Sequence, residues 1–188
     1  MSTVTFTTAE LQALAKLVAP LIQLPSPTPV PTPTPAASVV YQDGQMNWTG
    51  DYSYPAPPLT IDYRDTTGAP KSGTYCIKVD PHGAPYGAWQ PYANAAGNWD
   101  TSPYTSLNFD LKPTDAGAAF QVQFLLAGDK PTGVSVPLSK YGPLQAGVWT
   151  TFSIPLADLG VAKTTIYKWA CQNIGSAKPW YINNARFQ

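Results

Sequence analysis

The stretch FQVQFLL, residues 120–126, decides the fold class of this chain. Its apolar side chains alternate with the amides Gln121 and Gln123, so an extended segment would carry the apolar groups on one face and the amides on the other. The stretch TSLNFDL, residues 105–111, has the same two-residue period. Such alternation is typical of a β-strand with one buried face.

Short runs of this kind recur from residue 38 onwards and are separated by Gly, Pro and Asp turn signals. No long helical pattern competes with them in this region. The predicted strands lie at residues 38–42, 46–53, 59–63, 73–79, 86–92, 104–111, 119–127, 133–138, 148–154, 165–173 and 179–187. The fold class is therefore predicted to be all-β, an antiparallel β-sandwich of the jelly-roll type over residues 38–188.

Composition limits the functions that this chain can serve. Only 12% of its 188 residues are charged, and eleven basic and eleven acidic residues give a formal net charge of zero. There is thus no electrostatic case for binding nucleic acid or an anionic membrane. No apolar segment reaches the roughly 18 to 20 residues that span a bilayer, so membrane insertion is not expected. The N-terminus lacks the basic residues of a secretory signal, which predicts assembly in the cytoplasm.

An amphipathic helix is predicted within residues 1–24. Thr7 can cap it, and Glu10, three residues later, can reach back to complete a capping box. A helix of about 12 residues is marginal alone in water, so its apolar stripe needs a partner. This stripe is the predicted partner-binding surface and consists of Leu11, Leu14, Leu17, Val18, Leu21 and Ile22.

A linker is predicted over residues 25–37, because prolines occupy every second position from residue 25 to residue 35. This pattern favours polyproline II, at about 3.1 Å per residue, and a semi-rigid spacer. A helix that belonged to the core of its own sandwich would not need such a spacer. We therefore expect the helix to dock on other protein subunits or to self-associate, in a homo-oligomer or a large assembly. Packing against its own sandwich is the alternative.

Four stretches of the sandwich region resemble a known family. AGVWTTFSIPLADLG (146–160), IYKWACQNIG (166–175) and PWYINNARF (179–187) are similar to the closing strands of jelly-roll carbohydrate-binding modules. VVYQDGQMNW (39–48) is similar to their first strand. The resemblance covers nearly all of residues 39–187. It implies a sandwich that can bind glycans, although the same fold also serves in viral capsid and adhesion proteins.

The same resemblance bears on metal binding. Modules of this group often carry aspartates in the last strand that help to hold a structural calcium ion, whereas this chain has Asn183 and Asn184 there. Neutral amides bind calcium more weakly than carboxylates do. Asp43 could still contribute a ligand. A calcium site and ordinary hydrogen-bonding asparagines therefore both stay open, and no metal ligand is assigned.

Candidate ligand-binding residues gather in the loop-rich stretch from residue 80 to residue 104. Proteins hold sugars with flat aromatic rings and short amide or carboxyl side chains, and this stretch supplies both kinds. The predicted ligand-binding residues are Tyr86, Trp89, Tyr92, Trp99, Tyr104, Asn98 and Asp100. The alternative is that the aromatics are half-buried packing residues, and the same residue types also suit contacts between proteins.

No catalytic residues, metal ligands or cofactors are predicted. His82 is the only histidine, and the sandwich region contains no glutamate. One histidine and two cysteines are too few for a zinc site of the usual ligands, and neither a G-x-S-x-G motif nor a phosphate loop is present. Cys76 and Cys171 are expected to be buried free thiols, with one cross-strand disulfide as the alternative.

These observations predict a non-enzymatic structural or adhesion protein of a large particle, anchored by its helix and displaying a carbohydrate-binding-like jelly roll. A decoration or fibre protein on a phage virion surface, able to contact surface glycans, fits the stiff tether, the neutral charge and the missing signal. The alternative is a carbohydrate-binding module of an extracellular polysaccharide-degrading system.

Overall fold

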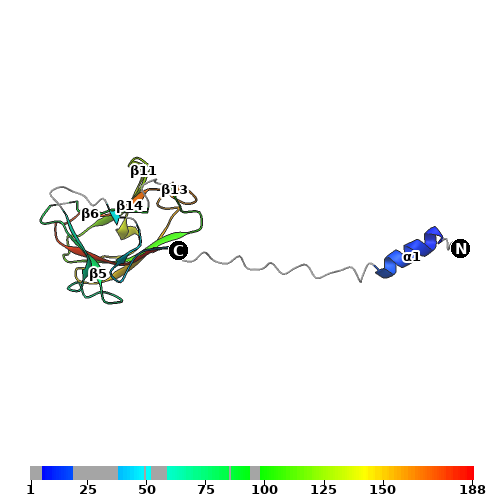
Figure 1. Ribbon diagram of the computed structural model, residues 1–188, viewed down its shortest axis with the longest axis horizontal. Helices are drawn as coiled ribbons and strands as arrows, with labels where there is room; N and C mark the ends of the chain where they lie inside the picture. Colours follow the sequence, from blue (N-terminus) through cyan, green and yellow to red (C-terminus); the bar gives the residue numbers. More distant parts are fainter. Residues whose placement is uncertain (1–5, 19–37, 49, 52–58, 85, 94–97) are drawn as a thin grey trace. The chain divides into compact units, whose positions relative to one another are not determined.

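The computed structural model describes residues 6–18, 38–48, 50–51, 59–84, 86–93 and 98–188 of the chain. The chain divides into two units, residues 1–34 and residues 35–188. Among the described residues, the first unit forms a helix and the second a β-sandwich (Figure 1). Within the same residues, no helix is both long enough and apolar enough to cross a membrane.

Helix α1 (Thr8–Val18) begins with the predicted capping box. The backbone N–H of Thr7 donates to Glu10 Oε2 at 2.8 Å, and the backbone N–H of Glu10 donates to Thr7 Oγ1 at 3.4 Å. The hydrogen bond from the Thr7 backbone also holds the pKa of Glu10 below its usual value. These reciprocal bonds satisfy N–H groups that the first helical turn leaves without a partner, so the helix start is confirmed.

The predicted partner-binding stripe is described in part. Phe6 and Leu11 are 63% and 53% exposed, so these two apolar side chains are open to solvent. The backbone of α1 also includes Leu14, Leu17 and Val18, whereas Leu21 and Ile22, like the linker, lie outside the described residues. Docking of this stripe on a partner therefore stays a prediction.

The sandwich consists of two antiparallel sheets, which confirms the predicted fold class. Sheet A contains β1 (Ser38–Gln42), β2 (Gln45–Met46), β4 (Thr60–Asp65), β5 (Cys76–Asp80), β9 (Ser106–Pro113), β12 (Thr150–Pro155) and β15 (Trp180–Phe187). Its order is β12-β9-β15-β1-β2, with β5 also paired to β15 and β4 paired to β5.

Sheet B forms the second layer of the sandwich. It contains β3 (Gly50–Asp51), β6 (Ala88–Trp89), β7 (Pro91–Tyr92), β10 (Phe120–Leu126), β11 (Lys130–Pro137) and β14 (Lys168–Asn173). Its order is β11-β10-β14-β7-β3, with β6 also paired to β14. A small third sheet pairs β8 (Trp99–Asp100) with β13 (Thr165–Ile166), and a 3-10 helix, η2 (Leu138–Lys140), follows β11. Figure 1 shows the layers apart, with β5 in one and β6 and β14 in the other.

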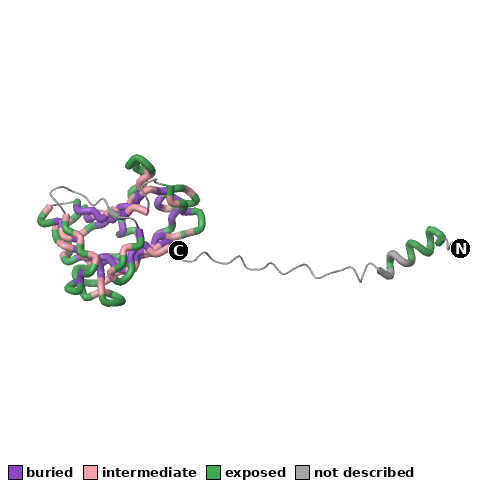
Figure 2. Tube along the Cα trace, viewed as in Figure 1, coloured by how far each residue is buried: buried purple, intermediate pink, exposed green. Residues whose placement is uncertain are grey.

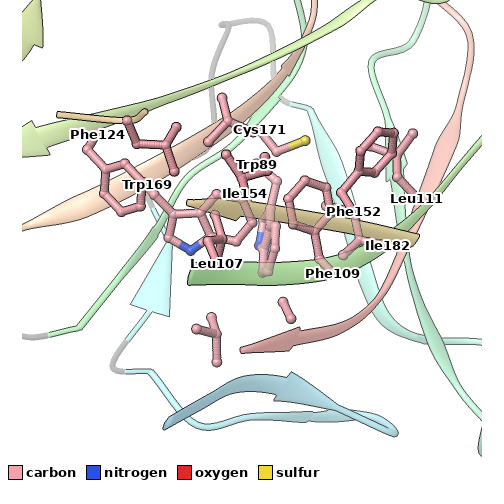
Figure 3. Close-up of a cluster of buried hydrophobic side chains, with 14 of the residues drawn as sticks. Trp89, Leu107, Phe109, Leu111, Phe124, Phe152, Ile154, Trp169, Cys171 and Ile182 are labelled. Atoms are coloured by element: carbon pink, nitrogen blue, oxygen red, sulfur yellow. The ribbon is translucent and has the colours of Figure 1, made fainter. Parts of the chain in front are cut away.

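The core lies between the two layers, where Figure 2 shows the buried residues concentrated. Alternate residues of β9 and β12 point inward from sheet A, and alternate residues of β10 and β14 meet them from sheet B. Trp89 and Trp169 pack edge to face at 5.2 Å, and Phe109 lies 5.5 Å from Trp169 (Figure 3). Large aromatic side chains therefore bridge the two sheets and are a major part of the core.

Tyr41 is a fully buried residue of β1 whose hydroxyl is hydrogen-bonded on both sides. It donates to the carbonyl oxygen of Tyr63 at 2.8 Å and accepts from the backbone N–H of Gly44 at 3.0 Å. Burial raises the pKa of this phenol to about 12, because the charged form would lose its hydration. The hydroxyl thus ties the β1–β2 turn to β4.

The two cysteines are buried free thiols, as expected. Cys76 lies on β5 of sheet A and Cys171 on β14 of sheet B. Burial raises the pKa of Cys76 to about 11 and raises that of Cys171 further still. Both thiols therefore stay neutral at physiological pH and pack as small apolar groups.

Candidate functional site

The outer face of sheet A is crossed by the loop that joins β4 to β5, residues 66–75. The Lys71 ammonium group donates to Asp110 Oδ1 at 2.8 Å and also contacts the hydroxyl of Thr151. Trp149 Nε1 donates to the carbonyl oxygen of Ala69 at 2.8 Å. These contacts hold the loop over β9 and β12, so this part of sheet A is closed to a large ligand.

The side chains that could have held calcium tie the same loop to the last strand and to the β1–β2 turn. Asn183 Nδ2 donates to the carbonyl oxygen of Ser72 at 3.0 Å, and Asn184 Nδ2 donates to Asp110 Oδ2 at 2.8 Å. Asp43 Oδ1 accepts the backbone N–H groups of Thr74 and Tyr75 at 2.6 and 2.9 Å.

This arrangement does not fit a calcium ion. A hard cation needs several oxygen acceptors turned towards it, whereas here amide N–H groups and the Lys71 ammonium group face the Ser72 carbonyl oxygen and both carboxylate oxygens of Asp110. Only Asn183 Oδ1 is a buried side-chain oxygen without a donor in the described part of the chain. Among the described residues there is also no cluster of three or more His, Cys, Asp or Glu side chains suited to a metal. The asparagines at the strand end are hydrogen-bonding residues, which was the other interpretation of the sequence.

The outer face of sheet B carries amides on β10 and β14. In β10, Gln121 and Gln123 point away from the core, and in β14 their direct partners are Gln172 and Ala170. We call this surface the glutamine face and define it by Gln121, Gln123, Leu125, Lys168, Ala170 and Gln172. It lies on the opposite side of the sandwich from the β4–β5 loop.

A relay of hydrogen bonds fixes two of these amides. Gln121 Nε2 donates to Gln172 Oε1 at 2.8 Å, and Gln172 Nε2 donates to the carbonyl oxygen of Tyr86 at 3.1 Å. The amide of Gln123 has no hydrogen bond to any described residue. Because the relay uses one donor of Gln121, its amide oxygen is still available to a ligand, as is the whole amide group of Gln123.

Tyr86 stands at the border of the glutamine face in a strained conformation. Its side chain is 54% exposed, and its backbone has a φ of 66°, a region that bulky residues rarely adopt. The hydrogen bond from Gln172 to its carbonyl oxygen helps to hold it there. An exposed aromatic ring is thereby presented beside fixed amides, and strain of this kind is common at functional positions.

The charge on the glutamine face is neutralised within the fold. Lys168 is buried, and its ammonium group lies 2.8 Å from Asp129 Oδ1 in the β10–β11 turn. Tyr92, opposite Lys168 on β7, packs against Tyr167 with ring centroids 5.8 Å apart. The face therefore combines neutral amides, a paired charge and two half-buried tyrosines.

One predicted ligand-binding residue has to be corrected. Trp89 has no exposed surface, because it pairs with Cys171 and packs on Trp169 in the core. Its neighbour Ala88, which pairs with Gln172, is also buried. Trp89 is therefore a core residue that a ligand does not reach in this fold.

The other predicted residues fall into two groups. Tyr86 and Tyr92 border the glutamine face, as described above. Trp99 and Tyr104 stack on each other at 5.2 Å with planes 6° apart, and the Trp99 ring lies 4.5 Å from that of Phe187. Both rings are partly buried packing residues of that cluster.

The two polar members of the prediction are exposed. Asp100 Oδ1 accepts the backbone N–H of Ser102 at 2.8 Å, and this bond holds the pKa of Asp100 below its usual value. Asn98 lies just before β8. Asp100 thus stabilises a turn, which is the usual role of aspartate in such contexts.

A hydroxyl, imidazole and carboxylate lie close together at the edge of sheet A. Thr60 Oγ1 and His82 Nε2 are 2.6 Å apart, and His82 Nδ1 lies 3.6 Å from Asp80 Oδ1. Asp80 Oδ1 already accepts the backbone N–H of His82 at 2.9 Å. Because the imidazole is more than half exposed and the carboxylate serves a turn, this group resembles a surface hydrogen-bonded turn more than a catalytic triad.

A groove of about 550 Å³ lies where β10 begins, beside Pro137, the β11 partner of Gln121. Phe120, Pro137, Leu144 and Ile174 line it, together with Lys140. Its walls are mainly apolar, which suits a ligand rich in hydroxyl groups less well than the amides and tyrosines of sheet B do.

Comparison with known proteins supports the fold-level resemblance. No family model matches the chain, and no curated protein matches it. A family 30 carbohydrate-binding module from a cellulosomal cellulase of Clostridium thermocellum superposes with a TM-score of 0.58 at 14% identity, covering 82% of this chain and 98% of that one. Most of the neighbours compared are carbohydrate-binding modules, and a β-1,2-glucanase from Parabacteroides distasonis also superposes, with a TM-score of 0.52 at 17% identity, covering 81% of this chain and 25% of that one.

Two structures of variants of one family 29 carbohydrate-binding module superpose similarly. The variant in complex with mannohexaose has a TM-score of 0.54 at 13% identity and covers 81% of this chain and 90% of that chain. The variant in complex with cellulohexaose has a TM-score of 0.54 at 15% identity and covers 81% and 89%. Similarity at this level of identity establishes a shared sandwich fold.

Proposed function

We propose that this protein is a non-enzymatic carbohydrate-binding module that holds a neutral glycan on the glutamine face. The neighbours described above support this function, which was the alternative in the sequence analysis, better than they support a virion role. The observation that carries the proposal is the relay from Gln121 through Gln172 to Tyr86 on the outer face of sheet B, the sheet that the β4–β5 loop does not cross.

The chemistry of the face suits sugar hydroxyl groups. A primary amide offers both donors and acceptors, so Gln121 and Gln123 can each bond a hydroxyl in either direction. The orientation of the Gln121 amide is fixed before binding by its hydrogen bond to Gln172, which lowers the entropy cost of association. The exposed ring of Tyr86 supplies a flat surface for the apolar side of a sugar ring. Ala170, opposite Gln123, is itself fully buried, so contacts on this face fall to the partly exposed amides and to Tyr86.

The neutral charge of the face favours an uncharged polysaccharide. The Lys168 ammonium group is already paired with Asp129, so it offers little attraction to an acidic sugar. A non-catalytic role is proposed because the sandwich region has no glutamate and its one histidine lies in an exposed turn. A glycosidase would need two carboxyl groups set across a bound sugar.

The test is affinity electrophoresis of the full chain in gels that contain a soluble mannan or a soluble cellulose derivative. We expect retarded migration of the natural protein in at least one of these gels. Gln172→Ala removes two hydrogen bonds that orient the site and should weaken binding about fivefold to thirtyfold, the equivalent of one to two bonds at roughly 1 kcal/mol each. Tyr86→Ala should weaken it by a similar factor.

The matched control is Gln145→Ala, because Gln145 is an exposed glutamine in a loop away from the glutamine face. This variant should migrate as the natural protein does. Unretarded migration in every neutral polysaccharide, or identical affinity for Gln172→Ala and the natural protein, would contradict the proposal.

We further propose that the N-terminal helix attaches the module to other protein subunits, or to copies of itself, with the proline-rich segment as a spacer. Support comes from the exposed Phe6 and Leu11 and from the short length of α1, which needs a partner to be stable. In the full chain, Leu11→Asp should lower the mass measured by light scattering if copies associate. An unchanged monomeric mass for both proteins would refute self-association.

Attachment to a large particle is the finer form of this proposal, and a phage virion is one such particle. Its support is limited to the helix and the spacer. If the protein is a virion component, the full chain should co-sediment with the phage virions, and Leu11→Asp should abolish this co-sedimentation. Equal recovery of both proteins free of particles would count against the virion role and would leave glycan binding untouched.

A further inference from the structure

Arg186 is brought to the outer face of sheet A by an irregularity in the last strand. Ile182 points into the core, so simple alternation would turn residue 186 inward as well. The pairing of β15 with β9 shifts register between Asn183 and Arg186, and Asn184 has a φ of 52°. After this bulge, Ala185 and Phe187 are buried and Arg186 faces outward beside Asn108.

Arg186 has no partner for its charge. Its Nε atom is buried without a hydrogen bond, and the guanidinium group makes no ion pair or hydrogen bond with any residue that the structure describes. Buried donors are nearly always satisfied in folded proteins, and leaving one unsatisfied is costly. A donor that a strand bulge has placed but that the protein leaves unused is a candidate ligand contact.

A pocket of about 220 Å³ adjoins Arg186 and is lined by Lys71, Asn108, Phe109, Asp110, Thr151, Asn184 and Arg186. Asp110 is the one acidic residue of this lining. Its Oδ1 accepts from Lys71 and Thr151, and its Oδ2 accepts from Asn184. Because its charge is balanced by Lys71, the charge of Arg186 is the excess, and the pocket is positive by one unit.

We infer that this pocket is a binding site for a carboxylate group, such as the uronate of an acidic sugar, with Arg186 as its anchor. The guanidinium plane can present two parallel N–H donors to one carboxylate, a geometry that lysine cannot reproduce. Asn108, directly opposite Arg186, adds an amide for a neighbouring hydroxyl. The volume suits one ring or less, below the roughly 300 Å³ at which typical ligand pockets begin.

This site is independent of the glutamine face. It lies on the other sheet and takes an anion, whereas the proposed glycan site takes neutral hydroxyl groups. A ligand could carry either chemistry alone. The two sites can therefore be tested separately, and failure of one leaves the other standing.

The chain offers a direct spectroscopic test, because Arg64 and Arg186 are its only arginines. Their Nε–H groups give two separate signals in a proton–nitrogen NMR spectrum. Arg64 lies over the Tyr75 ring, 4.8 Å from its centroid, and serves as an internal control. Sodium glucuronate, glucose, sodium acetate and sodium chloride are titrated into the full-length protein at matched ionic strength.

We expect glucuronate to shift the Arg186 signal in a saturable way, while the Arg64 signal stays in place and glucose and chloride have no effect. Acetate tests whether the site needs the sugar ring as well as the carboxylate. If acetate shifts the Arg186 signal as much as glucuronate does, the site binds carboxylates in general. If acetate shifts it less, the site prefers a uronate. Arg186→Lys should weaken glucuronate binding at least threefold, as measured by the remaining backbone signals around Asn108.

Two results would overturn the inference. One is an Arg186 signal that does not move at glucuronate concentrations up to about 50 mM. A dissociation constant of about 50 mM corresponds to a binding free energy of only about 2 kcal/mol in the 1 M standard state. The other is an equal, non-saturating shift of both arginine signals, which would identify ordinary ionic screening.

Discussion

The structure predicts that the β4–β5 loop is locked by a lysine and needs no metal. Lys71→Met removes the ammonium group and keeps the aliphatic chain. Asp110, only 4% exposed, then keeps Thr151 and Asn184 as donors but loses its counter-charge. Removing one partner of a buried ion pair costs about 3 to 5 kcal/mol. Because the Lys71 side chain is 38% exposed, solvent screens part of this effect.

We therefore expect Lys71→Met to lower the free energy of unfolding by about 1.5 to 3 kcal/mol, the range of one hydrogen bond to a charged group. The assay is urea denaturation at pH 7, followed by tryptophan fluorescence. Lys130→Met, at an exposed position of β11, is the matched control and should change stability by less than about 0.5 kcal/mol.

Metal dependence completes this test. Calcium at millimolar concentration, or a chelator, should leave the denaturation midpoint of the natural protein unchanged, because amide and ammonium donors face the oxygens of this region. Two outcomes would refute the reasoning. They are a Lys71→Met variant as stable as the natural protein and a midpoint that rises with calcium.

Other predictions concern stability and are measured by the same urea titration. Tyr41→Phe loses both hydrogen bonds of the buried hydroxyl and should cost about 1 to 3 kcal/mol. The pKa of Tyr41 is raised from 10.0 to about 12, so the phenol's contribution to the free energy of unfolding is complete below pH 10. This contribution is lost as the pH rises towards 12, at about 1.4 kcal/mol per pH unit. Tyr41→Phe should therefore lose stability less steeply with rising pH in this range. Gly133→Ala meets open space but requires a φ of 80°, so it should lower stability by about 1 kcal/mol. Gly175→Ala places a Cβ against the Gly117 carbonyl oxygen and should lower stability by more than that. Trp89→Ala should cost about 3 to 5 kcal/mol, because it empties a fully buried site; near-natural stability would show that the ring is not in the core.

The sandwich was predictable because its longer strands have one buried face. Along β10, Phe120, Val122 and Phe124 are buried while the glutamines between them are partly exposed. The interruptions were harder to foresee. The predicted strand at 86–92 is divided into β6 and β7, and the two-residue strand β8 was missed, because so few residues carry no recognisable period.

The candidate site was predicted only in part. Alternation in FQVQFLL already places Gln121 and Gln123 on the outer face, and this was the available signal for the site. The aromatic content of residues 80–104 favoured Trp89 as a ligand-binding residue instead, because the sequence AWQPY does not reveal which side of the strand faces the core. Its direction is set by pairing with Cys171, far away in the sequence.

Long-range contacts explain the rest of the difference. Lys71 and Asp110 are 39 residues apart, and Asn183 and Ser72 are 111 residues apart. No local pattern predicts that these groups meet, so the sequence does not reveal that a loop covers part of sheet A. The bulge that turns Arg186 outward is equally hidden, because strict alternation would place its side chain in the core.

The distribution of charge separates the two proposed sites. Lys71, Lys140 and Lys168 each lie within 2.8 Å of an aspartate, so their charges are balanced inside the fold. Arg186 has no such partner among the described residues, and the glutamine face has no unpaired charge of its own. Raising the ionic strength should therefore weaken carboxylate binding at Arg186 and leave neutral glycan binding nearly unchanged, since screening acts on charges and not on amide hydrogen bonds. Arg186→Gln should abolish the first activity alone, and Gln172→Ala should weaken the second alone. A variant on one sheet that impaired both would mean that the two faces are not separate sites.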